Sequence, residues 1–214
     1  GLIDPIDDLP HREEPSLVEQ WQFDFWSPEH DLGGWTHFTY DQSSRKGWYV
    51  TVLVGVDRQI VLVVDPKIQI PQLTQYLEFR AEGIWAQHVC ETPLEHWTVG
   101  LEAFGVTLET AEDAMGNQWG KRTGVGLDLE WEQIGKPEST DSGFSQQCLV
   151  TGEVLIDDEV IDLNAQGWRS RSWSSDLDVI NRPRGNGIHI DVGGIILTIE
   201  PNFSGQQWHG RLSR

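Results

Sequence analysis

Acidic, basic and imidazole side chains in the middle of the sequence are the first candidates for chemistry. The set consists of Glu91, Glu95, His96, Asp128, Glu130 and Arg169. A carboxyl group that faces a closed apolar cavity has a raised pKa, which keeps it protonated for general acid catalysis. We therefore predict that Glu91, Glu130 and Arg169 are catalytic. The alternative is that Asp128 and Glu130 face solvent from an amphipathic strand.

The segment from His88 to His96 also contains Cys90, Glu91 and Glu95, residue types that bind metals. Pro93 forces a turn in it, and strand alternation would split its side chains between two faces. The sequence contains no glycine-rich phosphate loop, zinc-spaced Cys/His set or nucleophile elbow. We expect no metal site and no cofactor.

Tryptophan is unusually frequent, with eleven residues in the chain. Each indole buries on the order of 150–250 Å² and carries one N–H group that needs a partner. We predict an aromatic-lined cavity whose ligand-binding residues are Trp21, Trp85, Trp97, Trp131, Trp173 and His96. Such rings suit an apolar metabolite and stabilise developing positive charge by about 0.5–2 kcal/mol per contact. The alternative is a β core that is merely rich in tryptophan.

Hydrophobicity with a period of two predicts strands along most of the chain. Trp21, Phe23 and Phe25 share one face of the segment 18–26. Further strands are expected at 35–40, 48–54, 59–64, 76–87, 97–104, 127–132, 146–156, 159–167, 188–191, 195–200 and 207–212. Asp157-Asp158 and Gly193-Gly194 are expected to form tight hairpin turns. No long segment has helical periodicity, so the fold class is all-β.

Residues 1–16 contain three prolines among many charges and are expected to form an extended N-terminal arm. Residues 17–214 are expected to form one β-barrel domain, with 109–125 and 135–143 as long loops at its mouth. A two-sheet sandwich is the alternative. A closed barrel is favoured because no strand has the features that protect a sheet edge.

The formal net charge is −19, from 34 acidic and 15 basic residues. This field repels phosphate backbones and anionic lipids, so nucleic acid and membrane surfaces are not expected partners. No apolar run approaches the 18–20 or so residues of a membrane-spanning helix. A cytoplasmic location is expected, and a homodimer is left open. Cys90 and Cys148 are expected as buried thiols, with a single cross-strand disulfide as the alternative.

Several phrases together resemble one family. They are Glu-Gly-Ile-Trp-Ala-Gln-His-Val-Cys-Glu-Thr-Pro at 82–93, Glu-His-Trp at 95–97, Asp-Leu-Glu-Trp-Glu at 128–132, Cys-Leu-Val-Thr-Gly-Glu-Val at 148–154 and Gly-Trp-Arg-Ser-Arg-Ser-Trp at 167–173. The sequence is similar here to the lipocalin-like superfamily of carotenoid 1,2-hydratase (hydroxyneurosporene synthase) and its actinobacterial relatives. The resemblance implies a lipocalin-like antiparallel β-barrel around an apolar cavity.

The family signature is Gly-x-Arg-Asp-His-Ser-Trp-Gly, and typical members extend further beyond it than this sequence does. The chain keeps Gly167, Arg169, Ser172 and Trp173, and it has Ser170, Arg171 and Ser174 in place of Asp, His and Gly. The expected carboxylate and imidazole are therefore replaced. Relatives with this architecture include cofactor-free cyclases, among them [4+2] cycloaddition catalysts, which need no acid–base pair.

The resemblance therefore implies a cofactor-independent cyclase or isomerase that holds a polyketide or terpenoid in the barrel. Orientation of the substrate would supply several kcal/mol. Arg169 or an indole N–H would polarise a substrate carbonyl. The alternatives are a non-catalytic carrier of an apolar ligand, a hydratase of a polyene, or a subunit that uses the barrel only as an interaction surface.

Overall fold

The structure is a computed structural model that describes residues 3–70, 76–110, 113, 120–140, 142–175, 188–191, 196–202 and 207–213. The chain divides into two compact units, Gly1–Ser175 and Asp176–Arg214. The described part of the second unit is a three-stranded antiparallel sheet in the order β12-β13-β14. Its strands are β12 (Ile188–Asp191), β13 (Ile196–Asn202) and β14 (Gln207–Ser213).

The described part of the first unit contains one 3-10 helix and an eleven-stranded antiparallel sheet. Its elements are η1 (Pro5–Asp8), β1 (Val18–Ser27), β2 (Leu32–Asp41), β3 (Lys46–Gly55), β4 (Ile60–Gln69), β5 (Tyr76–Ala81), β6 (Ile84–Thr92), β7 (His96–Leu108), β8 (Lys121–Gln133), β9 (Glu138–Thr140), β10 (Gly143–Ile156) and β11 (Glu159–Ser174). The strands follow the order β4-β3-β2-β1-β11-β10-β8-β7-β6-β5, and β9 pairs with β10.

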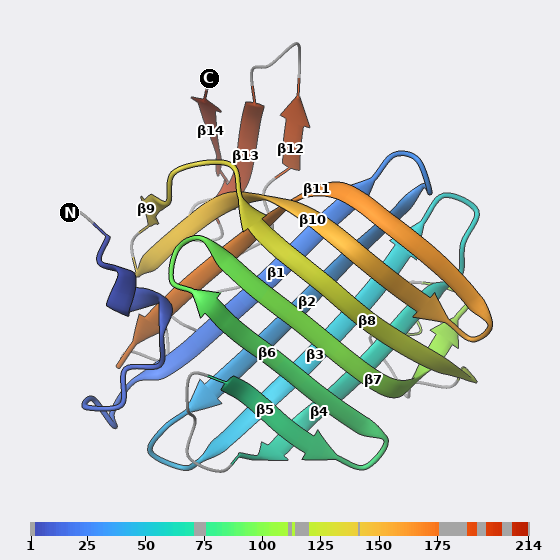
Figure 1. Cartoon of the computed structure of the whole chain (residues 1–214), viewed down its shortest axis with the longest axis horizontal. Coiled ribbons are helices and arrows are strands. Elements are labelled where there is room, and N and C mark those ends of the chain that lie inside the picture. The colour runs from blue at the N-terminus through green and yellow to red at the C-terminus, as the bar shows by residue number, and fades with distance from the viewer. Residues whose placement is uncertain are drawn as a thin grey trace. The chain divides into compact units, whose positions relative to one another are not determined.

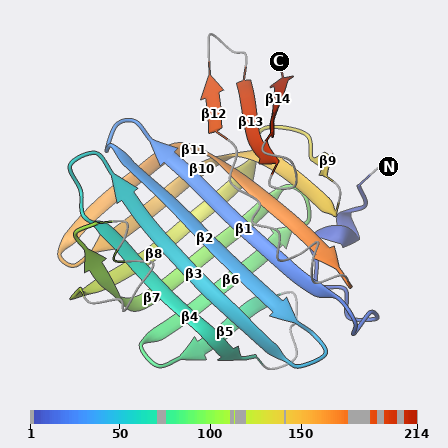
Figure 2. The same cartoon turned by 180° about the vertical axis from the view of Figure 1, so that it is seen from behind.

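The sheet closes on itself through β7. The first part of β7 pairs with β6, and its last residues, Val106–Leu108, pair with residues 60–62 of β4. Figure 1 shows β6, β7 and β8 crossing in front of β1, β2 and β3, and Figure 2 shows the same two layers from behind. This closure pairs three residues of β4 that would lie on the edge of an open sheet. The unit is a lipocalin-like antiparallel β-barrel, and the predicted fold class is confirmed.

Strand alternation decides which side chains fill the barrel. Trp21, Phe23 and Phe25 of β1 point inward, as predicted, and no more than 6% of any of the three is exposed. On β8 the inward set is Leu127, Leu129 and Trp131, while the residues between them lie on the outer face. The predicted two-residue turn at Asp157-Asp158 is also confirmed, with Asp157 at a φ of 52° between β10 and β11.

Two sequence predictions for the first unit need correction. The single strand expected at 76–87 is the hairpin β5–β6, which turns at Gly83 with a φ of 73°. Glycine adopts this left-handed conformation without strain, so the alternating pattern can reverse there. The N-terminal segment is not simply extended, because Asp4 caps η1 and Asp8 at its end is fully buried.

The predicted hairpin at Gly193-Gly194 lies outside the described residues. Of the predicted mouth loop at 109–125, residues 111–112 and 114–119 also lie outside them, and residues 121–125 belong to β8, so the prediction is wrong for those five residues. The other predicted loop, 135–143, contains the short strand β9. Among the described residues, no helix is long and apolar enough to cross a membrane.

Candidate functional site

Polar side chains lie inside the barrel at one end, next to the N-terminal segment. The inward row of β11 continues from Ala165 through Gly167 to Arg169 and Arg171, so the alternation of one strand carries two arginines into the interior. Both views place η1 beside the end of β11 (Figures 1 and 2). A buried guanidinium group needs a paired charge, and each arginine has its own carboxylate.

Arg169 pairs with Asp8. Arg169 Nη1 lies 2.6 Å from Asp8 Oδ1, and Nη2 lies 3.0 Å from Oδ2. Nη2 also donates to Gln146 Oε1 at 2.6 Å. The same Asp8 Oδ2 accepts hydrogen bonds from Trp97 Nε1 at 3.0 Å and from the Leu94 backbone N–H at 2.6 Å. One carboxylate therefore accepts from four N–H donors in three parts of the barrel, and the Cys90 thiol is a fifth, weaker donor with Sγ 4.0 Å from Oδ2.

Arg171 pairs with Glu19 of β1, and both side chains are fully buried. His11 shares the same carboxylate, with Nδ1 3.0 Å from Glu19 Oε2. Burial opposes ionisation of Glu19, yet Arg171 and His11 together hold its pKa below the ordinary value. The Arg171 guanidinium carbon lies 3.9 Å from the centre of the Trp21 ring, an attractive cation–π arrangement.

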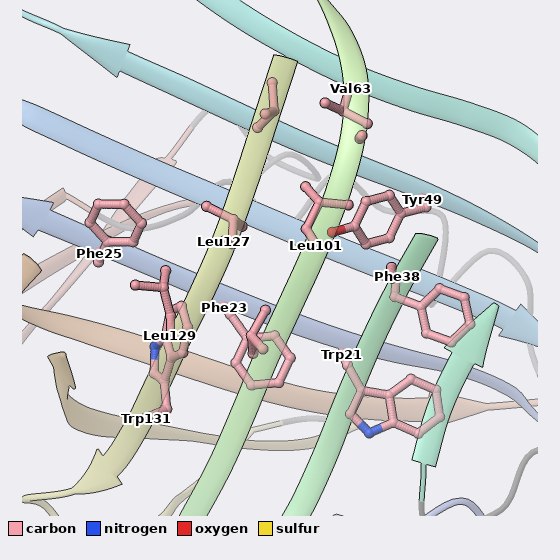
Figure 3. Packing of buried hydrophobic residues seen from close by; sticks show 14 of the residues in the cluster. Trp21, Phe23, Phe25, Phe38, Tyr49, Val63, Leu101, Leu127, Leu129 and Trp131 are labelled. Atoms are coloured by element: carbon pink, nitrogen blue, oxygen red, sulfur yellow. The ribbon is translucent and has the colours of Figure 1, made fainter. Parts of the chain in front are cut away.

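A cluster of aromatic rings fills the barrel beyond the charged pairs. The centroid of the Phe23 ring lies 5.3 Å from that of Trp131, 5.6 Å from Trp97 and 5.8 Å from His88. Figure 3 shows Phe23 beside Trp131, and Trp21 beside Phe38. Three of the predicted ligand-binding residues, Trp21, Trp97 and Trp131, are therefore brought into one interior cluster with at most 1% exposure.

Several polar atoms in this cluster lack a partner. Within the described residues, the indole nitrogens of Trp21 and Trp131 make no hydrogen bond. Among the same residues, the ring nitrogens of His88 have no side-chain partner, and the only polar interaction of the ring is with the Gln87 backbone. Burial lowers the pKa of His88 to about 3, so its ring is neutral at physiological pH. A buried donor or acceptor without a partner costs about 1–3 kcal/mol. The interior thus holds polar groups that a bound carbonyl or hydroxyl could satisfy.

Other predicted site residues lie on the outside of the barrel. Glu91 is exposed at the end of β6. Glu130 and His96 are hydrogen-bonded to each other on the outer face of β8 and β7, with 41% and 34% of their side chains exposed. Trp85 lies outside beside Glu78 and Arg80. Their positions follow from alternation, because each is adjacent in sequence to an inward residue. The predicted split of the 88–96 segment between two faces is confirmed.

Trp173 is partly buried, and the two cysteines are buried. The Trp173 ring is partly buried at the end of β11, 4.7 Å from the ring of His11. Cys90 and Cys148 are both free and buried, and burial raises the pKa of each thiol to about 12. The predicted buried thiols are confirmed.

A second group of residues with shifted pKa values lies on the outer face of β1 and β2. Asp24 stands directly between Trp35 on β2 and Trp168 on β11 in the strand register, and burial raises its pKa to about 7. His37 stacks on Trp48 with 4.6 Å between ring centres, and burial lowers its pKa to about 4. At neutral pH the imidazole of this group is uncharged.

Sequence reasoning missed the carboxylates Asp8 and Glu19 and the partners His11 and Gln146. For Glu19 a signal was present, because it shares its parity on β1 with Trp21 and Phe23. The same parity argument applies to Arg171 relative to Arg169. Asp8 has no such signal, since it precedes the first strand.

The fold and the interior site define a lipocalin-like β-barrel. The chain belongs to the family described as Domain of unknown function (DUF7064), which matches residues 4–182. No curated protein matches the sequence.

Solved structures with a similar fold include a protein from Nitrosomonas europaea described as an AttH, with 15% identity and a TM-score of 0.57. That alignment covers 99% of this chain and 72% of the other. Two structures of CghA, one with Sch210972 and one without, are 12% identical, with TM-scores of 0.45 and 0.46. They align with 93% and 94% of this chain, which spans only 57% and 58% of theirs.

Proposed function

We propose that the barrel interior binds a long apolar metabolite, such as a polyketide or terpenoid, and that the protein acts on it as a cofactor-independent cyclase or isomerase. The observation that carries this proposal is the set of unpartnered polar atoms inside an apolar cluster. In the described part of the chain, Trp21 and Trp131 each keep a buried nitrogen without a partner, and the ring nitrogens of His88 have no side-chain partner. Their burial costs stability unless a ligand supplies the missing acceptor or donor.

The chemistry would depend on shape and on hydrogen bonding. An apolar chain folded against rigid rings loses conformational freedom on binding, and orientation of this kind lowers a barrier by several kcal/mol. An indole N–H that donates to a carbonyl withdraws electron density from a conjugated double bond, which assists cyclisation. Trp131 is the best placed for this role, because its ring contacts Phe23 and Phe25 deep in the barrel.

Ligand entry requires movement. The interior is filled by the protein's own side chains, with Trp97, Phe38 and Tyr49 each fully buried. Close-packed interiors have few voids larger than a water molecule. A ligand of the proposed size must therefore displace a segment that is not part of the sheet, and the N-terminal segment before β1 meets this condition.

The test is incubation of the purified protein with a panel of linear polyenes and polyketides. Binding is followed by tryptophan fluorescence, and products are followed by mass spectrometry. The proposal predicts a cyclised or isomerised product of unchanged mass, formed faster than in buffer. A Trp131→Phe variant should bind more weakly or turn over more slowly, whereas Trp26→Phe on the outer face should behave as the wild type. No binding and no rate above buffer across the panel would overturn it.

A second candidate function, a non-catalytic carrier of an apolar ligand, is favoured by the charge pairing. Each interior carboxylate found among the described residues is held by its own arginine. Such paired groups are poor proton donors and acceptors. A carrier would bind members of the same panel, return them unchanged, and release a bound compound when denatured after purification.

A further inference from the structure

The donors around Asp8 form a preorganised site for a carboxylate. Two come from Arg169, one from the indole of Trp97 and one from the backbone of Leu94. Leu94 has a φ of 63°, an uncommon conformation for a residue other than glycine, and this turn presents its N–H to Asp8. Gln146 holds two of these donor residues in place, because it accepts a hydrogen bond from Arg169 and donates one to the Leu94 carbonyl at 2.8 Å. We call these four donors the carboxylate cradle.

The cradle belongs to the barrel, but the carboxylate in it does not. Asp8 lies in η1, before the first strand, and residues 3–16 make no strand pairing. Side-chain contacts hold this segment, including Arg171 to the Leu9 carbonyl at 3.1 Å and Gln42 to the His11 carbonyl at 2.7 Å. Glu19 is the useful contrast. It is the carboxylate of the neighbouring pair with Arg171 and belongs to β1, so the hydrogen bonds of the sheet fix its backbone in place.

The residue after Asp8 is apolar and also lies against the barrel interior. Leu9 packs against the apolar cluster of the barrel interior. The N-terminal segment therefore presents a carboxylate to the cradle and an alkyl group to the core beside it. This pair of features is the chemistry of an apolar carboxylic acid.

We propose that the cradle is a ligand site for an apolar carboxylic acid, whose carboxylate replaces Asp8 and whose hydrocarbon part replaces Leu9. The proposal rests on the proposed function, and it names the polar end of the ligand. An exchange of one carboxylate for another leaves Arg169 paired throughout. A neutral ligand that displaced Asp8 would leave the arginine buried without a counter-charge, which is strongly unfavourable. The site therefore selects acids over alcohols and esters.

The first experiment tests the cradle without any long ligand. Asp8→Ala removes the internal carboxylate, and acetate is the probe. We expect acetate to raise the melting temperature of this variant with a saturable dependence on concentration. Acetamide, and sodium chloride at the same ionic strength, should not do so. The wild type and Glu13→Ala, a change at an exposed carboxylate of the same segment, should show no saturable response. If acetate acts no differently from chloride or acetamide, the proposal is wrong.

The second experiment uses the wild-type chain, so it stands even if Asp8→Ala does not fold. Dodecanoate and dodecanol are compared below their aggregation concentrations, with limited trypsin digestion read by mass spectrometry. Arg12 is exposed within the N-terminal segment, and Arg80 on β5 is an exposed control site. Dodecanoate should increase cleavage after Arg12 several-fold and leave cleavage after Arg80 unchanged. Dodecanol should change neither.

The outcomes separate this proposal from the proposed function. If dodecanol or a neutral polyene binds as well as dodecanoate and cleavage after Arg12 does not rise, the carboxylate proposal is wrong and apolar binding stands. If acetate stabilises Asp8→Ala but no long apolar compound binds, the cradle stands and the proposed function is wrong.

Discussion

Arg169 on β11 holds the carboxylate of Asp8, 161 residues earlier in the chain, through two hydrogen bonds of 2.6 and 3.0 Å. Both side chains are almost completely buried. This contact ties the N-terminal segment to the last strand of the barrel. It lies at the end of the barrel where the polar groups of the interior gather.

Asp8→Ala should destabilise the protein strongly. The change leaves the Arg169 charge buried without its partner, and breaking a buried pair in this way costs about 3–5 kcal/mol. Urea unfolding at pH 7 measures the difference. Glu13→Ala on the exposed part of the same segment should stay within about 0.5 kcal/mol of the wild type. Equal effects of the two changes would contradict the assignment.

Glu19 and Arg171 should prove strongly coupled. Glu19→Leu and Arg171→Met each leave one buried charge without its partner, while the double variant removes both charges. We expect each single change to cost about 3–5 kcal/mol and the double variant to cost much less than their sum. The double-mutant cycle from urea unfolding gives the coupling energy. Additive costs would show that the two groups do not act as a pair.

Asp24 should make stability depend on pH. Its pKa is raised to about 7 in the folded protein, well above its ordinary value, so the folded state binds the proton more tightly than the unfolded chain. The stability that the folded state gains from this proton is fully present below about pH 4 and is lost as the pH rises through 7. Asp24→Asn should therefore gain stability relative to the wild type between pH 4 and 7.5. A difference that stays constant over this range would contradict the raised pKa.

Phe23 should be among the most costly residues to truncate. Its ring contacts Trp97, Trp131 and His88, so Phe23→Ala opens a cavity between them. Phenylalanine-to-alanine changes in packed cores cost about 3–5 kcal/mol. Trp26→Ala, three residues later on the same strand and 44% exposed, should cost far less. Similar costs for both would mean that the ring cluster is not the core.

The strands and their inward faces could be predicted because alternation is a local property. The immediate neighbours of Trp21 and Trp131 are enough to predict that both face the interior. The same rule failed at residues 76–87, where the alternating pattern continues across Gly83 although the chain reverses there. Whether a single glycine adopts a positive φ depends on the strands that pair around it, and this information is not local.

The charged part of the site was harder to predict for a related reason. Glu91 and Glu130 have residue types suited to catalysis, but their strands place both side chains on the outside. A buried charge is stable only with a partner, and the partner of Asp8 is distant in sequence. The sequence does not mark such pairs, whereas a closed barrel brings them together.

The most direct test of an interior ligand site is an NMR titration of the indole N–H resonances. The eleven tryptophans would be assigned with single Trp→Phe variants, and the ligand would be a panel member that quenches tryptophan fluorescence. If the ligand binds in the interior, the resonances of Trp21 and Trp131 should shift as their N–H groups gain an acceptor, while those of Trp26 and Trp85 on the outer face should stay in place. Shifts confined to Trp26 and Trp85, or no shifts at all, would contradict an interior site.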